Sequence, residues 1–169
     1  VSYCATCDGA FFKDKVTVVA GGGDVALEEA FFLTRFASKV YLVHRREHFR
    51  GADILQKRVL GNDKIIPVLN TNIESINGDN GVGSITLKST INGETSRLNT
   101  DGVFIFIGYD PNTSFMDKEL LNSNREIIVD MNMQTSIEGL FAAGDIRSGS
   151  KRQIVMAAAD GATAVMSAY

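Results

Sequence analysis

Two cysteines three positions apart, Cys4 and Cys7, carry the most distinctive chemistry of the sequence, and Asp8 follows them directly. Two thiols at this spacing can form and release a disulfide, and a neighbouring carboxylate can handle the proton because the thiolate is the attacking species. The same pair could supply half of a zinc site. Zinc requires four ligands, however, and neither His44 nor His48 accompanies a second cysteine pair. The sequence therefore favours redox chemistry and predicts no metal.

A glycine-rich turn is the second candidate site, and it fits the pattern GxGxxA with Gly21, Gly22, Gly23, Asp24, Val25 and Ala26. It follows a β-branched run at 15–20 and opens a helical pattern, which is the context of a dinucleotide-binding turn. Glycine permits the tight turn and the approach of a pyrophosphate, and Ala26 permits close packing of helix on strand. The free N–H groups of the helix N-terminus suit phosphates. An ordinary glycine turn remains the alternative.

A cluster of basic residues follows the next predicted strand, at 40–43, and consists of His44, Arg45, Arg46 and Arg50. Folds specific for NAD place an acidic residue near this position, on the ribose 2′-hydroxyl. Between residues 35 and 58 the chain has seven Lys or Arg against two acids, a local charge of +5 in a chain of net charge -3. Arginine binds phosphate oxygens in a bidentate manner. We therefore predict NADPH rather than NADH, with a solvated basic face as the alternative.

The predicted elements place these residues in an α/β fold. A strand at 15–20, a helix at 24–37 with Asp24 as N-cap, and a strand at 40–43 form a parallel βαβ unit. A helix at 52–60 ends at Gly61. Three strand-like runs with hairpin signals, at 72–77, 83–91 and 95–98, predict an antiparallel meander. The apolar run at 101–108 should return to the parallel sheet.

A shift toward polar composition after residue 108 predicts a domain boundary near residue 112. We expect residues 1–112 to form an NADPH-binding and CxxC redox domain. Residues 113–169 should add strands at 127–130 and 139–142 and a helix at about 151–169.

Composition narrows the function further. The chain has 169 residues, 44% hydrophobic and 22% charged, without the basic excess of a nucleic-acid-binding protein. Apolar runs such as 103–107 are far shorter than the roughly 20 residues that span a bilayer. Cysteines in CxxC spacing indicate a transient disulfide in a reducing compartment. We expect a cytoplasmic protein that binds neither nucleic acid nor membrane.

Five segments and one residue pair together resemble the low-molecular-weight thioredoxin reductases: CATCDG at 4–9, GGGDVALEEA at 21–30, HRREHFR at 44–50, GYDPNT at 108–113, AAGDIR at 142–147, and Arg152 with Gln153. The resemblance covers essentially the whole chain. It implies a Rossmann-like three-layer nucleotide-binding fold, joined to part of a second FAD-binding domain of the same type. It also implies a homodimeric flavoprotein that moves electrons from NADPH through FAD to the CxxC disulfide and then to thioredoxin. A flavin is the usual relay between a nicotinamide and a disulfide.

The resemblance also implies roles for individual residues. Cys7 would be the flavin-side sulfur, Cys4 the thiol that attacks thioredoxin, and Asp8 the acid that handles protons. Residues 21–26 would bind the pyrophosphate, and the 44–50 cluster the 2′-phosphate. Gly144 and Asp145 match the segment that meets the ribityl and phosphate region of FAD, although a plain turn would look the same. The predicted cofactor site is completed by Gly108, Ile146, Arg152, Gln153 and Ile154.

The sequence departs from the family in several places. The family carries a GxGxxG segment for the ADP half of FAD upstream of the CxxC, and it extends past Tyr169, so we expect a fragment. Such a fragment should bind little FAD and have negligible turnover. Val25 occupies a position where the family usually has Ser or Thr, and Lys151 one that is often aromatic or aliphatic.

Two other functions fit the same residues. One is a related flavoprotein disulfide reductase with another partner, such as the flavoprotein subunit of alkyl hydroperoxide reductase or an enzyme that serves a glutaredoxin-like protein. The other is a non-enzymatic module that senses NADPH and never cycles its cysteines.

Overall fold

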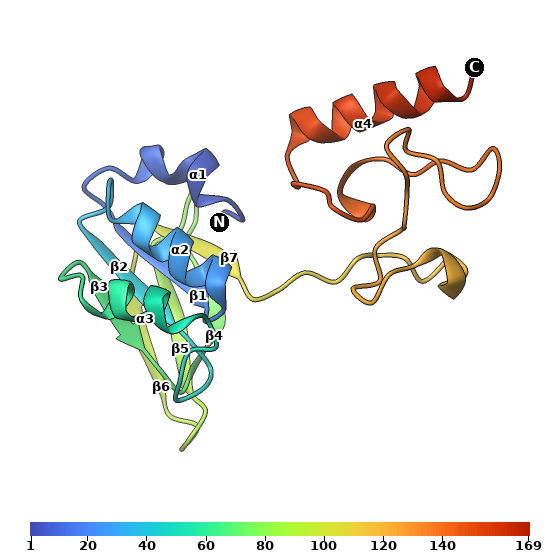
Figure 1. The fold of residues 1–169 in the computed structure, drawn as a ribbon. Helices are drawn as coiled ribbons and strands as arrows, with labels where there is room; N and C mark the ends of the chain where they lie inside the picture. The colour runs from blue at the N-terminus through green and yellow to red at the C-terminus, as the bar shows by residue number, and fades with distance from the viewer. The chain divides into compact units, whose positions relative to one another are not determined.

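The computed structural model describes residues 1–169. The chain forms two compact units, Val1–Gly108 and Tyr109–Tyr169, which are described separately below (Figure 1). No helix in the structure is both long enough and apolar enough to cross a membrane.

A four-stranded parallel sheet forms the centre of the first unit, with the strand order β3-β2-β1-β7. Its strands are β1 (Val16–Gly21), β2 (Lys39–Val43), β3 (Ile65–Val68) and β7 (Gly102–Phe106). Helix α2 (Asp24–Leu33) connects β1 to β2, and α3 (Asp53–Leu60) connects β2 to β3. The predicted βαβ unit and the return of the 101–108 run to the parallel sheet are confirmed.

Two layers cover this sheet. The antiparallel meander of β4 (Thr71–Asn77), β5 (Ser84–Ser89) and β6 (Thr95–Asn99) lies on one face. Helices α2 and α3 lie on the other face (Figure 1), together with the short α1 (Ala5–Asp8) and η1 (Gly9–Phe12). Neighbouring residues of β1 divide between the layers, because Val18 packs in the cluster with the meander and Val19 in the cluster with the helices. The predicted three-layer α/β fold is therefore confirmed.

The short α1 and η1 were not predicted, and three other local features of this unit differ from the predictions. Strand β3 was not predicted, because Pro67 interrupts its four residues, and Pro is tolerated there since β3 lies at the edge of the sheet. Asp24 is not the N-cap of α2: Gly23 is, and the Asp24 carboxylate instead accepts a hydrogen bond from the N–H of Ala52 at 2.7 Å. Helix α2 ends at Leu33, where the Thr34 hydroxyl donates to the carbonyl of Phe31.

The second unit contains one long helix, α4 (Ile154–Ser167), and two short turns, η2 (Lys118–Leu120) and η3 (Gly144–Ile146). The strands predicted at 127–130 and 139–142 are wrong, because only isolated bridges form there. Asp130 explains part of this result, since its carboxylate accepts from the N–H groups of Asn132 and Gln134 and turns the chain. Helix α4 begins three residues later than predicted, after Arg152 adopts a left-handed φ of 53°.

Candidate functional site

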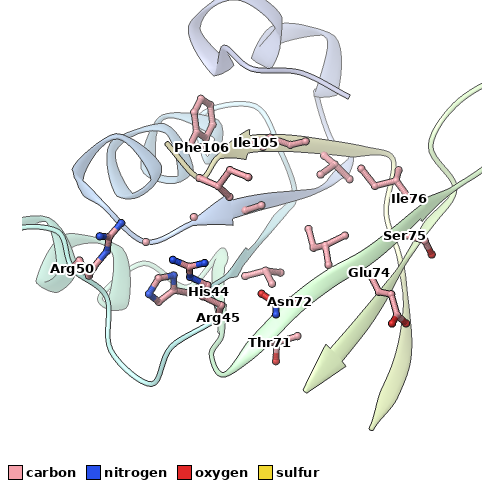
Figure 2. Close-up of a pocket in the computed structure, with 17 residues that line it drawn as sticks. His44, Arg45, Arg50, Thr71, Asn72, Glu74, Ser75, Ile76, Ile105 and Phe106 are labelled. Carbon is pink, nitrogen blue, oxygen red and sulfur yellow. The ribbon is translucent and has the colours of Figure 1, made fainter. Parts of the chain in front are cut away.

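A pocket of about 570 Å³ opens where the parallel strands β1, β2 and β7 end, beside β4 (Figure 2). Ligands of open α/β sheets bind outside the carboxyl ends of the strands, at the point where the strand order reverses. In this sheet that point lies between β1 and β7. The volume lies within the usual range for small-molecule sites, about 300–1,000 Å³. The lining residues are Ala20, Gly21, Gly22, Val43, His44, Arg45, Arg50, Thr71, Asn72, Ile73, Glu74, Ser75, Ile76, Val103, Ile105, Phe106 and Ile107.

The three glycines of the turn have different surroundings. Gly21 has a φ of +149°, and a Cβ there would collide with the carbonyl of Phe106. A Cβ on Gly22 would collide with the imidazole of His44. A Cβ on Gly23 would meet nothing within 4 Å. The first two glycines are therefore required by the packing of the protein itself, whereas the space beside Gly23 is open to a ligand.

The loop that carries Arg50 is fastened to the glycine turn through its backbone. The N–H groups of Arg50 and Gly51 both donate to the carbonyl of Gly22, at 2.7 and 3.1 Å. The bond from Ala52 to the carboxylate of Asp24 adds a third connection. The exposed Arg50 thus lies at the pocket, near His44 and Arg45, which also line it (Figure 2). Arg46 is exposed next to Arg45.

His44 differs from its arginine neighbours because it is buried, with 6% of its surface exposed. Its ring lies 5.6 Å from that of Phe49, and its Nε2 has no hydrogen-bond partner. Burial lowers the pKa of His44, and the charges of Arg50, Arg46 and Arg45 lower it further, against a hydrogen bond with the backbone of His48. At neutral pH this imidazole is therefore uncharged.

The two cysteines form a disulfide at the start of α1, with their Cα atoms 5.3 Å apart. Cys4 is half-buried and is the N-cap of α1, where its Sγ accepts a hydrogen bond from the N–H of Cys7 at 3.1 Å. Cys7 is exposed, and Asp8 ends the same helical turn, half-buried. The N–H of Cys7 would continue to stabilise a thiolate on Cys4 after reduction.

The segment before the disulfide is attached to the parallel sheet. Ser2 donates to the carbonyl of Val103 at 2.8 Å, and its own carbonyl accepts from Ile105 at 2.9 Å, so it pairs with β7. The hydroxyl of Ser2 then accepts from the N–H of Cys4. The strand that lines the pocket therefore also fixes the backbone on the N-terminal side of the disulfide.

In the second unit, Gly144 and Asp145 lie in a turn held by a buried ion pair. Asp160, 4% exposed, accepts from the guanidinium of Arg147 at 2.6 and 2.7 Å and from the N–H of Gly144 at 3.1 Å. Gly144 has a φ of +82°, which favours glycine. The carboxylate of Asp145 remains exposed, and Ile146 is half-buried.

Tyr109 joins two of the predicted segments within this unit. Its hydroxyl donates to the carbonyl of Asp145 at 3.2 Å, and the guanidinium of Arg152 lies 4.0 Å from the centre of its ring. Arg152 also pairs with Glu126 at 3.0 Å. Gln153 is the N-cap of α4 and is followed by the exposed Ile154. Gly108, with a φ of +112°, ends the first unit in open space.

We expect the second unit to lose stability in acid through Asp160. The hydrogen bonds from Arg147 hold the pKa of Asp160 below its ordinary value, although burial opposes them. A depressed pKa in the folded state stabilises the fold above the unfolded pKa of 3.8, and this contribution disappears as the pH falls through the folded value. Urea unfolding followed at the Gly144 amide by NMR should therefore give a lower midpoint near pH 3 than near pH 6.

The variant Asp160→Asn provides the control, because it should lose this pH dependence. At neutral pH we expect it to be less stable by about 3 kcal/mol, since Arg147 would keep a buried charge without its partner. An unchanged midpoint for Asp160→Asn at neutral pH would contradict the role of the ion pair.

Comparison with known proteins places the chain in a family. Residues 1–161 match the family model described as pyridine nucleotide-disulphide oxidoreductase, and the chain belongs to this family. It is 51% identical over 169 residues to a thioredoxin reductase of Bacillus subtilis (strain 168), covering 99% of this chain and 54% of that protein. A thioredoxin reductase of Peptoclostridium litorale is 48% identical over 175 residues, covering 99% of this chain and 56% of that protein.

Solved structures give the same result. The crystal structure of thioredoxin reductase from Streptococcus pyogenes MGAS5005 matches with a TM-score of 0.91 and 44% identity, over 99% of this chain and 56% of that one. Thioredoxin reductase from Giardia duodenalis matches with a TM-score of 0.84 and 39% identity, over the same shares. The predicted resemblance to thioredoxin reductases is thus confirmed. The chain spans about half the length of these relatives.

Sequence reasoning missed two groups of residues near these sites. The pocket is lined by residues 71–76 of β4 and by residues 105–107 at the end of β7, two strands that carried no functional pattern in the sequence. Glu29 contacts the segment that carries the disulfide, although it is one of two consecutive glutamates on a helix. The strand-like run and the hairpin signal beside it located β4, but only the folded structure shows that its residues 71–76 line the pocket.

Proposed function

We propose that the chain is the nucleotide-binding and redox-disulfide part of a thioredoxin-disulfide reductase, with part of its FAD domain. Electrons would pass from NADPH through FAD to the Cys4–Cys7 disulfide and on to thioredoxin. The observation that carries this proposal is that one unit contains both a redox disulfide and a glycine-turn pocket with arginines at its rim. Helix α2 serves both sites, because it begins at the glycine turn and packs against α1. The names of the relatives supply the partner, thioredoxin.

The pocket residues fit NADPH. The open space beside Gly23 and the first N–H groups of α2 suit the pyrophosphate. Arg45 and Arg50 at the pocket rim, with Arg46 beside them, suit the 2′-phosphate. The uncharged His44 would not bind the phosphate as a cation. Its ring packs against Gly22, and its Nε2 has no hydrogen-bond partner within the protein.

The chain also carries residues suited to FAD, which when bound would take a hydride from the nicotinamide and supply two electrons to a disulfide. The ion pair of Arg147 with Asp160 fixes the turn at Gly144, and Asp145 keeps an exposed carboxylate that can accept hydrogen bonds from hydroxyl groups. We assign Gly144, Asp145, Ile146, Arg152, Gln153 and Ile154 to this site, and Gly108 remains a predicted cofactor contact. Homodimer formation and a cytoplasmic location remain predictions from the sequence.

For the exchange step we use the roles of Cys4 and Cys7 that the resemblance to thioredoxin reductases implies. After reduction, the thiolate of Cys4, stabilised by the N–H of Cys7, attacks one sulfur of the thioredoxin disulfide. A mixed disulfide forms, and a thiolate of thioredoxin leaves. Cys7 then attacks the sulfur of Cys4, which restores the Cys4–Cys7 disulfide and releases thioredoxin as a dithiol. Asp8 accepts and returns the protons of the thiols.

A single-turnover experiment tests this function without a flavin. The chain is reduced with dithiothreitol, separated from it, and mixed with oxidised thioredoxin, and the thiols of thioredoxin are counted by mass spectrometry after alkylation. We expect up to one dithiol per chain. Cys7→Ser should stop at a mixed disulfide with thioredoxin through Cys4, and Cys4→Ser should transfer no electrons.

Parallel reactions with oxidised glutaredoxin and with the peroxiredoxin partner of alkyl hydroperoxide reductase separate the rival enzymes. Faster transfer to either of these partners than to thioredoxin would contradict the assignment. Absence of transfer to all three would favour a non-enzymatic nucleotide module.

A further inference from the structure

A carboxylate from α2 contacts the backbone beside the disulfide. Oε2 of Glu29 accepts a hydrogen bond from the N–H of Ala5 at 2.7 Å. Ala5 is fully buried and follows Cys4 directly, and Glu29 is half-buried. The bond is short for an N–H donor, as is typical of an ionised acceptor.

The bond from Ala5 to Glu29 lies beside apolar contacts of η1. Gly9 lies against Leu33 and Phe36, so that a Cβ on Gly9 would be 3.3 Å from Leu33. On the other side of Cys4, Ser2 holds the chain to β7. The backbone of Cys4 is therefore fixed on both sides, by Ser2 before it and by Glu29 after it.

Acidic and basic groups both lie near α1 and η1, and Lys15 lies over the ring of Phe12 in η1. Helix α2, which packs against α1, carries Asp24, Glu28 and Glu29, and Asp24 is bound to Ala52 at the far end of the helix. Glu28 lines a separate groove between α2 and α3. Neither η1 nor β7 carries an ionisable residue, and Asp8 is the acid of α1 itself. Glu29 is therefore the charge from a neighbouring element that touches the backbone next to Cys4.

We propose that Glu29 is a positioning residue for disulfide exchange, which holds the backbone beside Cys4 and, through its negative charge, makes the Cys4–Cys7 pair more reducing. The proposal rests on the proposed function, in which Cys4 and Cys7 cycle between disulfide and dithiol. A nearby negative charge disfavours a thiolate but leaves the neutral disulfide unaffected. The reduced form is thereby destabilised, so the pair gives up its electrons more readily. The opposite arrangement, a stabilised reduced form, makes a dithiol pair an oxidant.

The test compares the reduction potentials of isosteric variants of the 169-residue chain. Glu29→Gln keeps an oxygen acceptor for Ala5 but removes the charge, and Glu28→Gln removes the adjacent charge as the matched control. Each protein is equilibrated with mixtures of reduced and oxidised dithiothreitol, and the dithiol fraction is measured by alkylation and mass spectrometry. In this equilibrium two electrons and two protons pass from dithiothreitol, which closes to its disulfide, to Cys4–Cys7, which opens to the dithiol.

We expect Glu29→Gln to shift this equilibrium about tenfold toward the dithiol, which corresponds to a potential higher by about 30 mV. Glu28→Gln should match the unmodified chain. A second measurement uses a Cys7→Ser background, in which Cys4 of the Glu29→Gln variant should react with iodoacetamide at neutral pH several-fold faster. Far-ultraviolet circular dichroism checks that each variant is folded.

An unchanged or lower potential in a folded Glu29→Gln variant would overturn the proposal, as would an equal shift in Glu28→Gln. A purely structural role would leave Glu29→Gln like the unmodified chain and would affect only Glu29→Ala. The equilibrium contains neither thioredoxin nor a nucleotide, so its outcome is independent of the single-turnover test of the proposed function.

Discussion

Replacing both Arg45 and Arg50 with alanine is expected to weaken the binding of NADPH to the chain by at least about 100-fold, while the binding of NADH changes little. Both side chains lie at the rim of the pocket, and the chain has no acid at the end of β2 to receive a ribose hydroxyl. A hydrogen bond to a charged group contributes about 1.5–3 kcal/mol, so the loss of two such contacts accounts for this factor. Isothermal titration calorimetry with each nucleotide measures the effect.

Arg35→Ala is the matched control. Arg35 belongs to the same basic stretch of sequence, but it lies over the ring of Phe32 and lines the groove between α2 and α3. Its removal lowers the net charge by one unit, against two in the double variant, and does not touch the pocket, so NADPH binding should stay within a factor of a few. Equal affinity of the unmodified chain for NADH and NADPH would contradict the 2′-phosphate assignment.

Gly21→Ala is expected to lower the free energy of unfolding of the first unit by about 2–4 kcal/mol. Its φ of +149° is unfavourable for alanine, and the new methyl group would meet the carbonyl of Phe106, which belongs to the neighbouring strand β7. Neither β1 nor β7 can move aside there without loss of the hydrogen bonds that join the two strands. Urea unfolding followed by circular dichroism, with the amide signals of β1 followed by NMR, measures the change.

Gly23→Ala separates folding from binding at the same turn. Its φ of -92° suits alanine, and its new methyl group would meet no protein atom within 4 Å. We expect nearly unchanged stability, together with NADPH binding weakened about tenfold or more if the pyrophosphate occupies that space. Unimpaired NADPH binding by Gly23→Ala would show that the nucleotide lies elsewhere.

The first unit could be predicted from local patterns because its signals agree with one another. A β-branched run, a glycine turn and a helical repeat all indicate β1 and α2, and Asn92-Gly93 indicates the hairpin between β5 and β6. Strand β3 was missed because Pro67 and its short length hide it. In the second unit, the apolar residues near Ile127 indicated a strand, but such runs need a partner strand and here find single bridges.

The candidate sites could be predicted only in part, and for a physical reason. Cysteines, glycines and arginines reveal their chemistry by type and spacing along the chain. Glu29 accepts a hydrogen bond from Ala5, which lies 24 positions away in the sequence. The sequence alone does not distinguish Glu29 from the adjacent Glu28. The burial of His44 likewise depends on Gly22, whose backbone packs directly against the imidazole ring. Contacts of this kind become visible only once the chain is folded.

The carbonyl of Gly22 constrains any redesign of the nucleotide specificity of the pocket. Because it receives the N–H groups of both Arg50 and Gly51, the place of Arg50 is determined by main-chain bonds that no side-chain substitution removes. Exchanging residues 45 and 46 for those of an NADH-selective protein would leave a cation held at the mouth of the pocket. A redesign for NADH should therefore also replace the side chain of Arg50, and loops transplanted from related proteins should include the glycine turn to which they are bonded.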